Sequence, residues 1–468
     1  MSEPLRRILP GIAIDLAHAY RRAGFGLWLV GGWVRDALLG SVHADLDFAT
    51  DAGPEGSLEV LDKWSGGKVW TTGFEFGTVA AQRGDTRIEV TTFRTEVYPP
   101  DSRNPEVSFA TDLETDLSRR DFTINALAIT LPEVSLVDPF GGAADLAGKR
   151  IRTPLEPEVS FGDDPLRMLR ALRFASTLDF VIDPGTLEAI GRMRERLAIV
   201  SLERIRDEFT KLMLGKVPSR TLYLVDATGL AEEFLPELPA LKLEQDPVHR
   251  HKDVFHHSLA VLENVCSMDV EDPDLALRLA ALLHDIAKPK TRQITPEGVT
   301  FHHHEVVGAD IAELRLKELR YPSRLVQEVR ELIYLHLRFH GYGEHWSDRA
   351  VRRYVRDAGA LLGKLNLLVR ADCTTRNPRR AQELAGRIDE LELRIRELAA
   401  QEELARLRPS LDGHEVMQHL GLPPGPLVGQ ALEFLMDIRL DEGEISKEEA
   451  HARLAEWYAR MGRGDASP

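Results

Sequence analysis

Two spacings of apolar residues divide the chain into an N-terminal region of mixed helices and strands and a longer helical region. Apolar residues recur every three or four positions over 11–23 and 33–39, which predicts amphipathic helices. Between them, the short apolar run LWLV ends at Gly31-Gly32 and predicts a buried strand, and the alternation of DLDFA predicts another. The predicted strands are 27–30 and 45–49, with others around 68–71, 77–82, 87–93 and 124–130.

Loop and helix patterns follow this region. The stretch 94–110 is rich in Pro, Asp and Asn, which predicts a loop. From about residue 160 the apolar spacing is helical, with a junction at 241–249, and 380–408 predicts a charged amphipathic helix. The expected fold class is therefore α+β, a region of strands and helices followed by all-α parts. The predicted domains are 1–150, 151–245, 246–375 and 376–468.

Composition places the chain among globular proteins. Its 468 residues exceed one compact core, so about two to four domains are expected. It contains no run of about 18 uncharged apolar residues, which predicts no membrane span, and its first residues lack the apolar core of a signal peptide. Cys266 and Cys373 form no CxxC pair, so neither a disulfide framework nor a thiolate zinc site is expected. These features favour a reducing cytoplasm.

The net charge of −16 argues against a protein that coats nucleic acid without specificity. A nucleic-acid enzyme needs only a local basic track, and arginines are dense in places, as at Arg167, Arg170 and Arg173. Any one such arginine is more often part of a solvated helix face. The charge balance therefore leaves a nucleic-acid enzyme open.

A glycine pair is followed by paired carboxylates near the N-terminus. Asp45 and Asp47 are two apart on a predicted strand and face the same side, where both can reach one pair of Mg²⁺ ions, as phosphoryl transfer requires. Gly31 and Gly32 let the backbone approach a triphosphate at the start of a helix. Glu89, on a neighbouring predicted strand, can supply a third carboxylate. A lone DxD or GG is usually a surface strand or a turn, but LVGGWVRDALLG followed by DLDFAT favours a nucleotide site.

This joint pattern resembles the head of the class II tRNA nucleotidyltransferase and bacterial poly(A) polymerase family, in the DNA polymerase β superfamily. Four later segments resemble further motifs of the family in the same order, and the resemblance covers roughly residues 25–240. It implies a polymerase-β-like head, built from a mixed sheet with helices, followed by a helical neck. The four segments are 119–128 (RRDFTINALA), 138–142 (DPFGG), 163–173 (DDPLRMLRALR) and 203–208 (ERIRDE).

The resemblance also implies roles for residues. Asp45, Asp47 and Glu89 would be catalytic, with Mg²⁺ held by the two aspartates, and other motif residues would bind the incoming CTP or ATP. Asp164 and Arg167 would bind its base edge. Three apart on a predicted helix, they share a face, and a carboxylate with a guanidinium can complement cytosine or adenine and mismatch uracil or guanine, although such a pair alone is more often a surface ion pair. The nucleotide-binding set is Gly31, Gly32, Arg35, Arg120, Asp121, Asn125, Asp164, Arg167, Arg170 and Arg173.

Segments outside the motifs favour CCA addition to tRNA over poly(A) addition. Residues 98–122 and 73–79 (GFEFGTV) resemble the CCA-adding branch, whereas bacterial poly(A) polymerases carry a more basic segment there. Three alternatives stand beside this interpretation. They are a poly(A) polymerase, a partial enzyme that adds only CC or only the final A, and an RNA-binding regulator dominated by a second metal site.

That second site lies in a helical block from 253 to about 373. Its order H…HD…H…H…D resembles the HD phosphohydrolase superfamily, including the two-metal form. Imidazole nitrogens and carboxylate oxygens suit Mn²⁺, Ni²⁺, Co²⁺, Fe²⁺ or Mg²⁺, and a water between two ions can attack a phosphoester. By the resemblance, a first ion would be held by His257, His284, Asp285 and Asp372, and a second with the help of His304 and His336.

Three choices in this block have close alternatives. His303 is nearly as good a candidate as His304, and Lys288, one turn after His284, is expected either to bind a phosphate or to face solvent. The candidate HD substrates are 2′,3′-cyclic phosphates, 2′-nucleotides and terminal phosphates on damaged tRNA. The expected partners are tRNA, CTP and ATP, without a membrane, and the sequence leaves the oligomeric state open.

Overall fold

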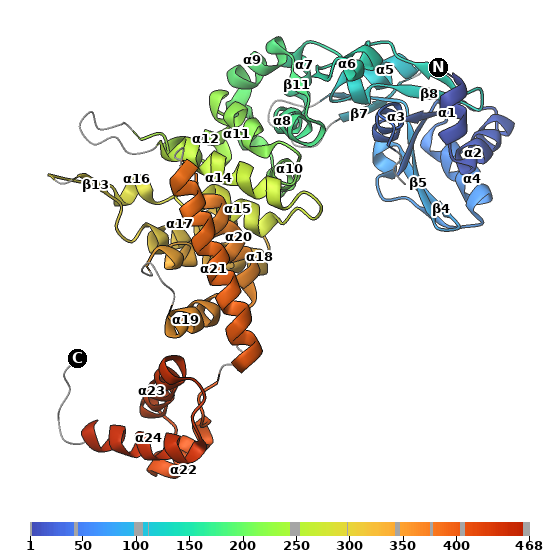
Figure 1. Ribbon diagram of the computed structural model, residues 1–468. Coiled ribbons are helices and arrows are strands. Elements are labelled where there is room, and N and C mark those ends of the chain that lie inside the picture. The colour runs from blue at the N-terminus through green and yellow to red at the C-terminus, as the bar shows by residue number, and fades with distance from the viewer. Residues whose placement is uncertain are drawn as a thin grey trace. The chain divides into compact units, whose positions relative to one another are not determined.

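The computed structural model divides into two compact units (Figure 1). The N-terminal unit comprises Met1–Ala240 with Glu318–Tyr321, and the C-terminal unit comprises Leu241–Lys317 with Pro322–Pro468. Among the described residues, no helix is long and apolar enough to cross a membrane. The structure describes residues 2–41, 45–97, 106–110, 112–243, 253–296, 298–341, 347–374, 378–402 and 408–461.

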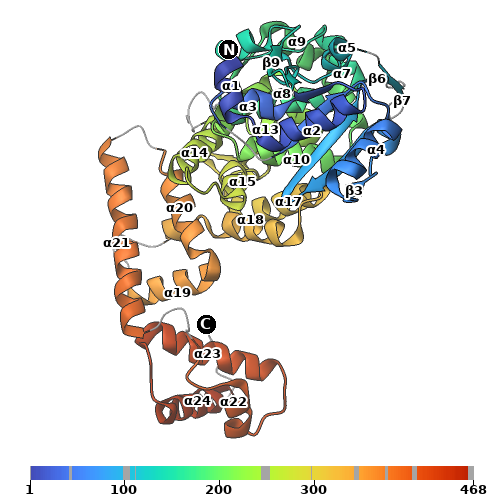
Figure 2. The ribbon, with the colours of Figure 1, turned by 90° about the vertical axis from the view of Figure 1, so that its right-hand side faces the viewer.

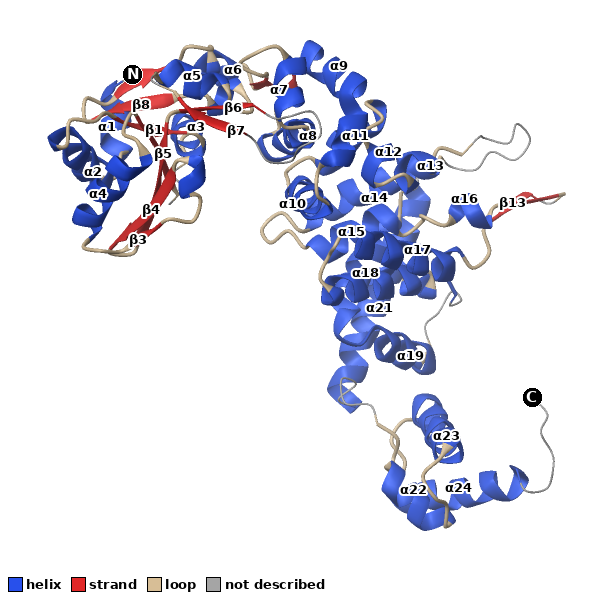
Figure 3. Cartoon of the chain, turned by 180° about the vertical axis from the view of Figure 1, so that it is seen from behind, coloured by secondary structure: helices blue, strands red, loops and turns tan. Residues whose placement is uncertain are grey.

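A seven-stranded sheet with the order β3-β4-β5-β2-β1-β8-β9 forms the centre of the N-terminal unit. β2 and β5 are parallel and the other neighbouring pairs are antiparallel, so the sheet is mixed, as predicted. Helices α2 (Gly11–Arg22) and α4 (Pro54–Ser65) cover one face (Figure 3). The strands are β1 Leu27–Val30, β2 Leu46–Thr50, β3 Val69–Trp70, β4 Thr78–Arg83, β5 Thr86–Thr92, β8 Ala128–Leu131 and β9 Ser135–Val137.

The strand register aligns one row of residues across this sheet. Residues directly opposite one another on neighbouring strands point to the same face. Burial along β5 separates the two faces, because Ile88 and Val90 are buried whereas Arg87 is exposed and Glu89 is half-buried. The more open face, which carries Glu89, holds the row Trp70, Ala80, Glu89, Asp47 and Val30. Within this row Trp70 and Asp47 are exposed, whereas Ala80 and Val30 are buried.

Two predicted elements differ from the structure. The stretch 94–110 is not all loop, because β6 (Arg94–Val97) and β7 (Glu106–Phe109) form an antiparallel pair. Its prolines lie at 99–105, outside the described residues, and the flanks are free to pair. The strand predicted around 124–130 begins only at β8, after a 3₁₀ turn, η2 (Thr123–Asn125), because Asn125 is turned into a buried polar network.

Helices complete the N-terminal unit. Gly142 begins α6, and a Cβ there would lie 2.1 Å from the backbone oxygen of Thr123, so only glycine fits. A short parallel pair, β10 (Arg150–Ile151) with β11 (Val181–Ile182), ties the sheet region to the helices that follow. The helices are α1 Ser2–Ile8, α3 Gly32–Leu38, α5 Leu113–Ser118, α6 Gly142–Ala147, α7 Pro157–Asp163, α8 Leu166–Leu178, α9 Pro184–Met193, α10 Leu202–Met213, α11 Pro218–Ala227, α12 Ala231–Phe234 and α13 Glu237–Ala240.

In its described residues, the C-terminal unit is helical apart from a hairpin of β12 (Gln293–Thr295) and β13 (Gly298–Thr300). The helix predicted over 380–408 is α21 (Pro378–Glu402), which runs beside α19 and α20 (Figure 2). The last helices pack around an apolar cluster that includes Val416, Leu435 and Leu454. The remaining helices are α14 Val254–Met268, α15 Leu275–Leu283, α16 Lys288–Thr291, α17 His304–Glu318, α18 Ser323–Leu335, α19 Asp348–Ala358, α20 Leu362–Asp372, α22 Gly413–Leu420, α23 Pro426–Glu442 and α24 Lys447–Met461.

Candidate functional sites

The predicted head carboxylates meet on the open face of the sheet. Asp45 directly precedes β2, and Asp47, within β2, stands opposite Glu89 on β5. Desolvation of the Asp47 carboxylate, opposed by Arg120 but reinforced by the negative charges of Glu89 and Asp45, raises its pKa. A bound cation would relieve this crowding of negative charge. The oxygen donors present therefore fit a hard divalent ion such as Mg²⁺.

The glycine pair brings the backbone close to these carboxylates. Gly31 has a φ of +74°, which favours glycine, and stands directly before α3. A Cβ there would lie 3.2 Å from Arg120 Nη1 and 3.9 Å from Asp47 Oδ2. Arg119 and Arg120 both donate to the buried Asp116, at 2.8 and 3.2 Å, which holds the second guanidinium in place. The space beside Gly31 thus has a cation on one side and a carboxylate on the other.

A path of hydrogen bonds links Arg35 to Arg170 behind this space. Arg35 donates to both carboxylate oxygens of Asp36, at 2.7 and 2.8 Å, and from Nη1 to Asn125 Oδ1 at 2.9 Å. Asn125 Nδ2 donates to Asp121 Oδ1 at 2.9 Å, and Arg170 Nε donates to Asp121 Oδ2 at 3.0 Å. Burial by itself raises the pKa of Asp121, but the positive charge of Arg170 outweighs it and the pKa falls to about 2. Asp121 is therefore ionised at neutral pH.

A second buried acid orders the arginines of α8. Arg173 Nε donates to Glu208 Oε2 at 2.9 Å, and Arg170 Nη1 lies 3.5 Å from Glu208 Oε1. The guanidinium carbons of Arg173, Arg35 and Arg170 lie 3.5, 5.2 and 5.9 Å from the ring centroid of Phe174. Three of the predicted nucleotide-binding arginines thus converge on one aromatic ring.

Asp164 and Arg167 do not share a helix, which corrects the sequence prediction. α7 ends one residue before Asp164, which is extended (φ −137°, ψ 101°), and α8 begins two residues after it, because a residue that precedes proline avoids helical geometry. Each side chain has its own partner. Arg204 Nη2 donates to Asp164 Oδ2 at 2.9 Å, whereas the buried Arg167 donates from Nη1 to Ser160 Oγ at 3.0 Å.

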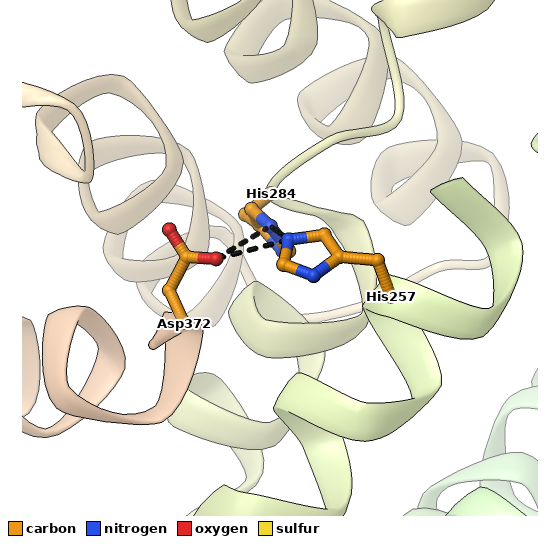
Figure 4. Close-up of side chains that lie close together, drawn as sticks. All are labelled: His257, His284 and Asp372. Carbon is orange, nitrogen blue, oxygen red and sulfur yellow. Dashed lines mark hydrogen bonds and ion pairs between the residues drawn. The ribbon is translucent and has the colours of Figure 1, made fainter. Parts of the chain in front are cut away.

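The predicted HD residues converge inside the C-terminal unit. His257 Nε2 lies 2.9 Å from Asp372 Oδ1 and 3.3 Å from His284 Nε2. His284 Nε2 lies 3.7 Å from the same carboxylate oxygen. Figure 4 shows the two rings and the carboxylate directed toward one point. These donors lie within 4.8 Å of one another, which fits a single metal ion.

Asp285, His304 and His336 form a second group of donors within 4.8 Å of one another. His304 Nδ1 donates to the Phe301 carbonyl at 2.7 Å, and His336 Nδ1 donates to the Ile333 carbonyl. These bonds leave each Nε2 as an acceptor, and each is buried without a hydrogen-bond partner among the described residues. Burial lowers the pKa of His336 to about 3. Neutral imidazoles with orphaned nitrogens are the form that binds a metal ion.

Asp285 stands between the two groups. Its Oδ2 lies 3.3 Å from His284 Nε2 and 3.5 Å from His257 Nε2, and its Oδ1 lies 3.2 Å from His304 Nε2. Burial by itself raises the pKa of Asp285, but His284 and Lys288 hold it well below the usual range. Lys288 Nζ donates to Asp285 Oδ2 at 2.6 Å, so this lysine is a partner of the acid and not the solvent-facing residue that the sequence allowed.

Sequence reasoning missed the residues that hold these side chains. Asp116 and Glu208 are buried acids bonded to the site arginines, and only the second lay in a motif. Thr374 Oγ1 lies 2.8 Å from Nδ1 of the first HD histidine, and no pattern in the sequence indicated it. Of the two adjacent candidates, His304 is buried within the second donor group, whereas His303 is exposed at a φ of +59°.

Three family models match the chain. Residues 27–152 match the poly A polymerase head domain, 179–241 match the probable RNA and SrmB-binding site of polymerase A, and 254–399 match the HD domain. The first match contains the glycine pair and the carboxylates, and the third contains the histidine–aspartate cluster. Fold and sites therefore define a protein with a polymerase head and an HD domain.

Similar proteins extend over nearly the whole chain. It is 35% identical to the A-adding tRNA nucleotidyltransferase of Deinococcus radiodurans, covering 92% of this chain and 95% of that one, and 34% identical to the CC-adding enzyme of Thermus thermophilus, covering 93% and 94%. The crystal structure of the Bacillus stearothermophilus CCA-adding enzyme in complex with CTP matches with a TM-score of 0.64 and 26% identity, covering 99% and 100%. The chain belongs to the class II tRNA nucleotidyltransferase/poly(A) polymerase family and carries an HD domain.

Proposed function

We propose that this protein transfers CMP and AMP from CTP and ATP to the 3′ end of tRNA and so builds the CCA terminus. The observation that carries the proposal is the alignment of Asp47 with Glu89 on neighbouring strands, beside Gly31 and Arg120. This arrangement places carboxylates for divalent ions next to a space bounded by a cation. Relatives that span the chain and are named for tRNA nucleotidyl transfer support the proposal.

The head residues have distinct tasks in this proposal. Asp45 and Asp47 would hold Mg²⁺ and Glu89 would supply a third carboxylate; when bound, the ion would neutralise the triphosphate and activate the terminal hydroxyl of the RNA. Gly31 admits the triphosphate close to the backbone, and Arg120 contributes its charge. The path from Arg35 through Asn125 to Asp121 orients the groups that contact the ribose and phosphates.

Base selection is assigned to Asp164 and Arg167. A carboxylate and a guanidinium together complement cytosine or adenine. Because Arg167 is anchored to Ser160 inside the unit and Asp164 is held by the half-exposed Arg204, the guanidinium is the more rigid of the two. This difference suits a site that must accept one base and then another.

Partial addition is the second candidate, because two relatives that span nearly the whole chain are named as an A-adding and a CC-adding enzyme. Primer extension with tRNA lacking its CCA terminus, given CTP and ATP separately and together with Mg²⁺, separates the candidates. Ordered addition of C, C and A followed by arrest supports the full activity. Arrest after CC, or A added only to a CC-ended tRNA, identifies a partial enzyme, whereas a long run of A identifies a poly(A) polymerase.

The HD cluster is proposed to hydrolyse a phosphoester. Its donors fit two divalent ions, Mn²⁺, Ni²⁺, Co²⁺, Fe²⁺ or Mg²⁺, which when bound would supply an activated water. The candidate substrates are 2′,3′-cyclic phosphates, 2′-nucleotides and terminal RNA phosphates. His284→Ala combined with Asp285→Ala should abolish hydrolysis and spare transfer, and Asp45→Ala combined with Asp47→Ala should do the reverse. Loss of both activities in either folded variant would contradict two separate sites.

The proposed division of labour follows four parts of the chain. Residues 1–150 perform the transfer, 151–245 select the base and bind RNA, 246–375 carry the HD activity, and 376–468 form the tail. Phosphate and shape recognition by a local basic track accounts for RNA binding by a chain of negative net charge.

A further inference from the structure

The open face of the head sheet continues past the carboxylates to a tryptophan. Trp70 on the edge strand β3 stands opposite Ala80, which stands opposite Glu89, so Trp70 points to the same face as Glu89 and Asp47. Neighbouring strands are about 4.8 Å apart, which puts Trp70 about 10 Å from Glu89 and about 14 Å from Asp47 along the row. Trp70 is 43% exposed, whereas Ala80, between it and Glu89 in the row, is buried.

Arg87 connects this tryptophan to the carboxylates. Its guanidinium carbon lies 5.8 Å from the Trp70 ring centroid, and its Nη2 donates to Glu89 Oε1 at 3.1 Å. The side chains of Arg87 and Glu89 are 68% and 46% exposed, so the pair leaves the ring accessible. An exposed aromatic ring beside a guanidinium is the combination that stacks the bases and contacts the phosphates of single-stranded nucleic acid.

The position in the row indicates which nucleic-acid component binds. Gly31 and Arg120, which bound the proposed triphosphate space, lie on the β1 side of Asp47. Trp70 lies on the other side, beyond β5 and β4. The row therefore differs on the two sides of Asp47. The β1 side is cationic and suits the triphosphate, whereas the β3 side is aromatic and suits the other substrate, the 3′ end of the RNA.

We propose that Trp70 and Arg87 form a platform for the 3′-terminal nucleotides of the RNA primer. One base stacks on the indole ring, the guanidinium contacts a backbone phosphate, and the terminal hydroxyl reaches the carboxylates. This platform rests on the proposed nucleotidyl transfer and adds a primer site to it. It positions the primer and takes no part in the chemistry.

The chain supplies a matched control. Trp64 on α4 stacks with Arg83 at 5.2 Å, but α4 covers the opposite face of the same sheet. Trp70→Ala should raise the KM for a tRNA primer about 5- to 150-fold, the effect of losing one base–aromatic stack, with the KM for CTP and ATP unchanged. Trp70→Phe keeps an aromatic ring and should have a primer KM close to the wild-type value. Trp64→Ala should leave the primer KM unchanged.

Steady-state kinetics on the full-length variants test whether Trp70 and Arg87 bind the primer, after circular dichroism has verified that each variant is folded. A wild-type protein that extends no RNA primer refutes the proposed function. A wild-type protein that extends primers, together with an unchanged primer KM in Trp70→Ala, refutes the platform alone. Equal losses in Trp70→Ala and Trp64→Ala, or a raised KM for CTP, also refute it. Arg87→Gln supplies an independent measure, because loss of a phosphate contact should weaken the salt dependence of primer binding.

Discussion

Replacing Asp121 by Asn isolates the charge at the centre of the hydrogen-bond network that links Arg35 to Arg170. The Asp121 carboxylate accepts hydrogen bonds from Arg170, from Asn125 and from the Phe122 backbone N–H. Its pKa falls from 3.8 to about 2 in the folded protein, which corresponds to about 2 kcal/mol of stabilisation at pH 7. Removing one partner of a buried pair also leaves Arg170 undercompensated. We therefore expect Asp121→Asn to lower the free energy of unfolding by about 2–4 kcal/mol.

The pH dependence of this effect follows from the direction of the pKa change. Because the pKa of Asp121 is lower in the folded than in the unfolded state, its stabilisation is complete above about pH 4 and is lost as the pH falls toward 2. The difference in stability between the wild type and Asp121→Asn should therefore be constant from pH 7 to pH 5 and shrink at lower pH.

Urea unfolding followed by tryptophan fluorescence measures this difference, since Trp28 and Trp33 report on the N-terminal unit. Asp179→Asn is the matched control, because the Asp179–Arg220 pair has side chains that are 43% and 55% exposed and should contribute less than about 1 kcal/mol. Equal unfolding midpoints for the two variants would refute the electrostatic account of the network.

Three further outcomes are expected. Asp47→Asn should abolish nucleotidyl transfer without changing the metal content of the HD site, and elemental analysis showing lost metal would contradict separate sites. His336→Ala should lose one bound ion per chain, while His303→Ala keeps both. Elemental analysis after chelation and reloading with Mn²⁺ measures this, and equal metal contents in the two variants would contradict the placement of the second donor group. Gly142→Ala should lower the free energy of unfolding, measured in urea, by about 1–3 kcal/mol, because its Cβ would overlap the backbone of Thr123. Gly162→Ala, whose Cβ meets open space, should not, and equal free energies of unfolding for the two variants would contradict that packing.

Local patterns predicted the elements that carry the sites. The strand ending at the glycine pair, the strand of Asp47 and the helical regions lie where apolar spacing placed them, because burial of one face sets that spacing. Family membership was also predictable, since five ordered motifs are in the sequence itself. The predicted loop failed at its two flanks, where pairing between β6 and β7 across eight intervening residues outweighed the composition of the whole stretch.

The sequence pattern did not predict which side chains from distant segments contact one another. The pairing of Arg204 with Asp164, forty residues apart, depends on how α10 packs against α8. Pro165 also interrupts the helix that was predicted to carry Asp164 and Arg167 on one face. Lys288 had a helical spacing that allowed a solvent-facing position, but the buried charge of Asp285 attracts it. Helix packing, the backbone restriction before proline and the charge of a buried acid thus decided these contacts, and none of the three can be read from apolar spacing.

The path from Arg35 to Glu208 has a consequence for how the N-terminal unit of this protein could be recombined with parts of a relative. It crosses residue 150, since Asp121 lies on the sheet side and Arg170 and Glu208 lie in the helices that follow. A head cut at residue 150 and joined to the helices of a relative would keep the buried Asp121 but would take the residue at the position of its partner Arg170 from the other protein. A chimera that keeps this network therefore needs its crossover beyond Glu208, which leaves the head carboxylates and the segment of Asp164 and Arg167 together in one block.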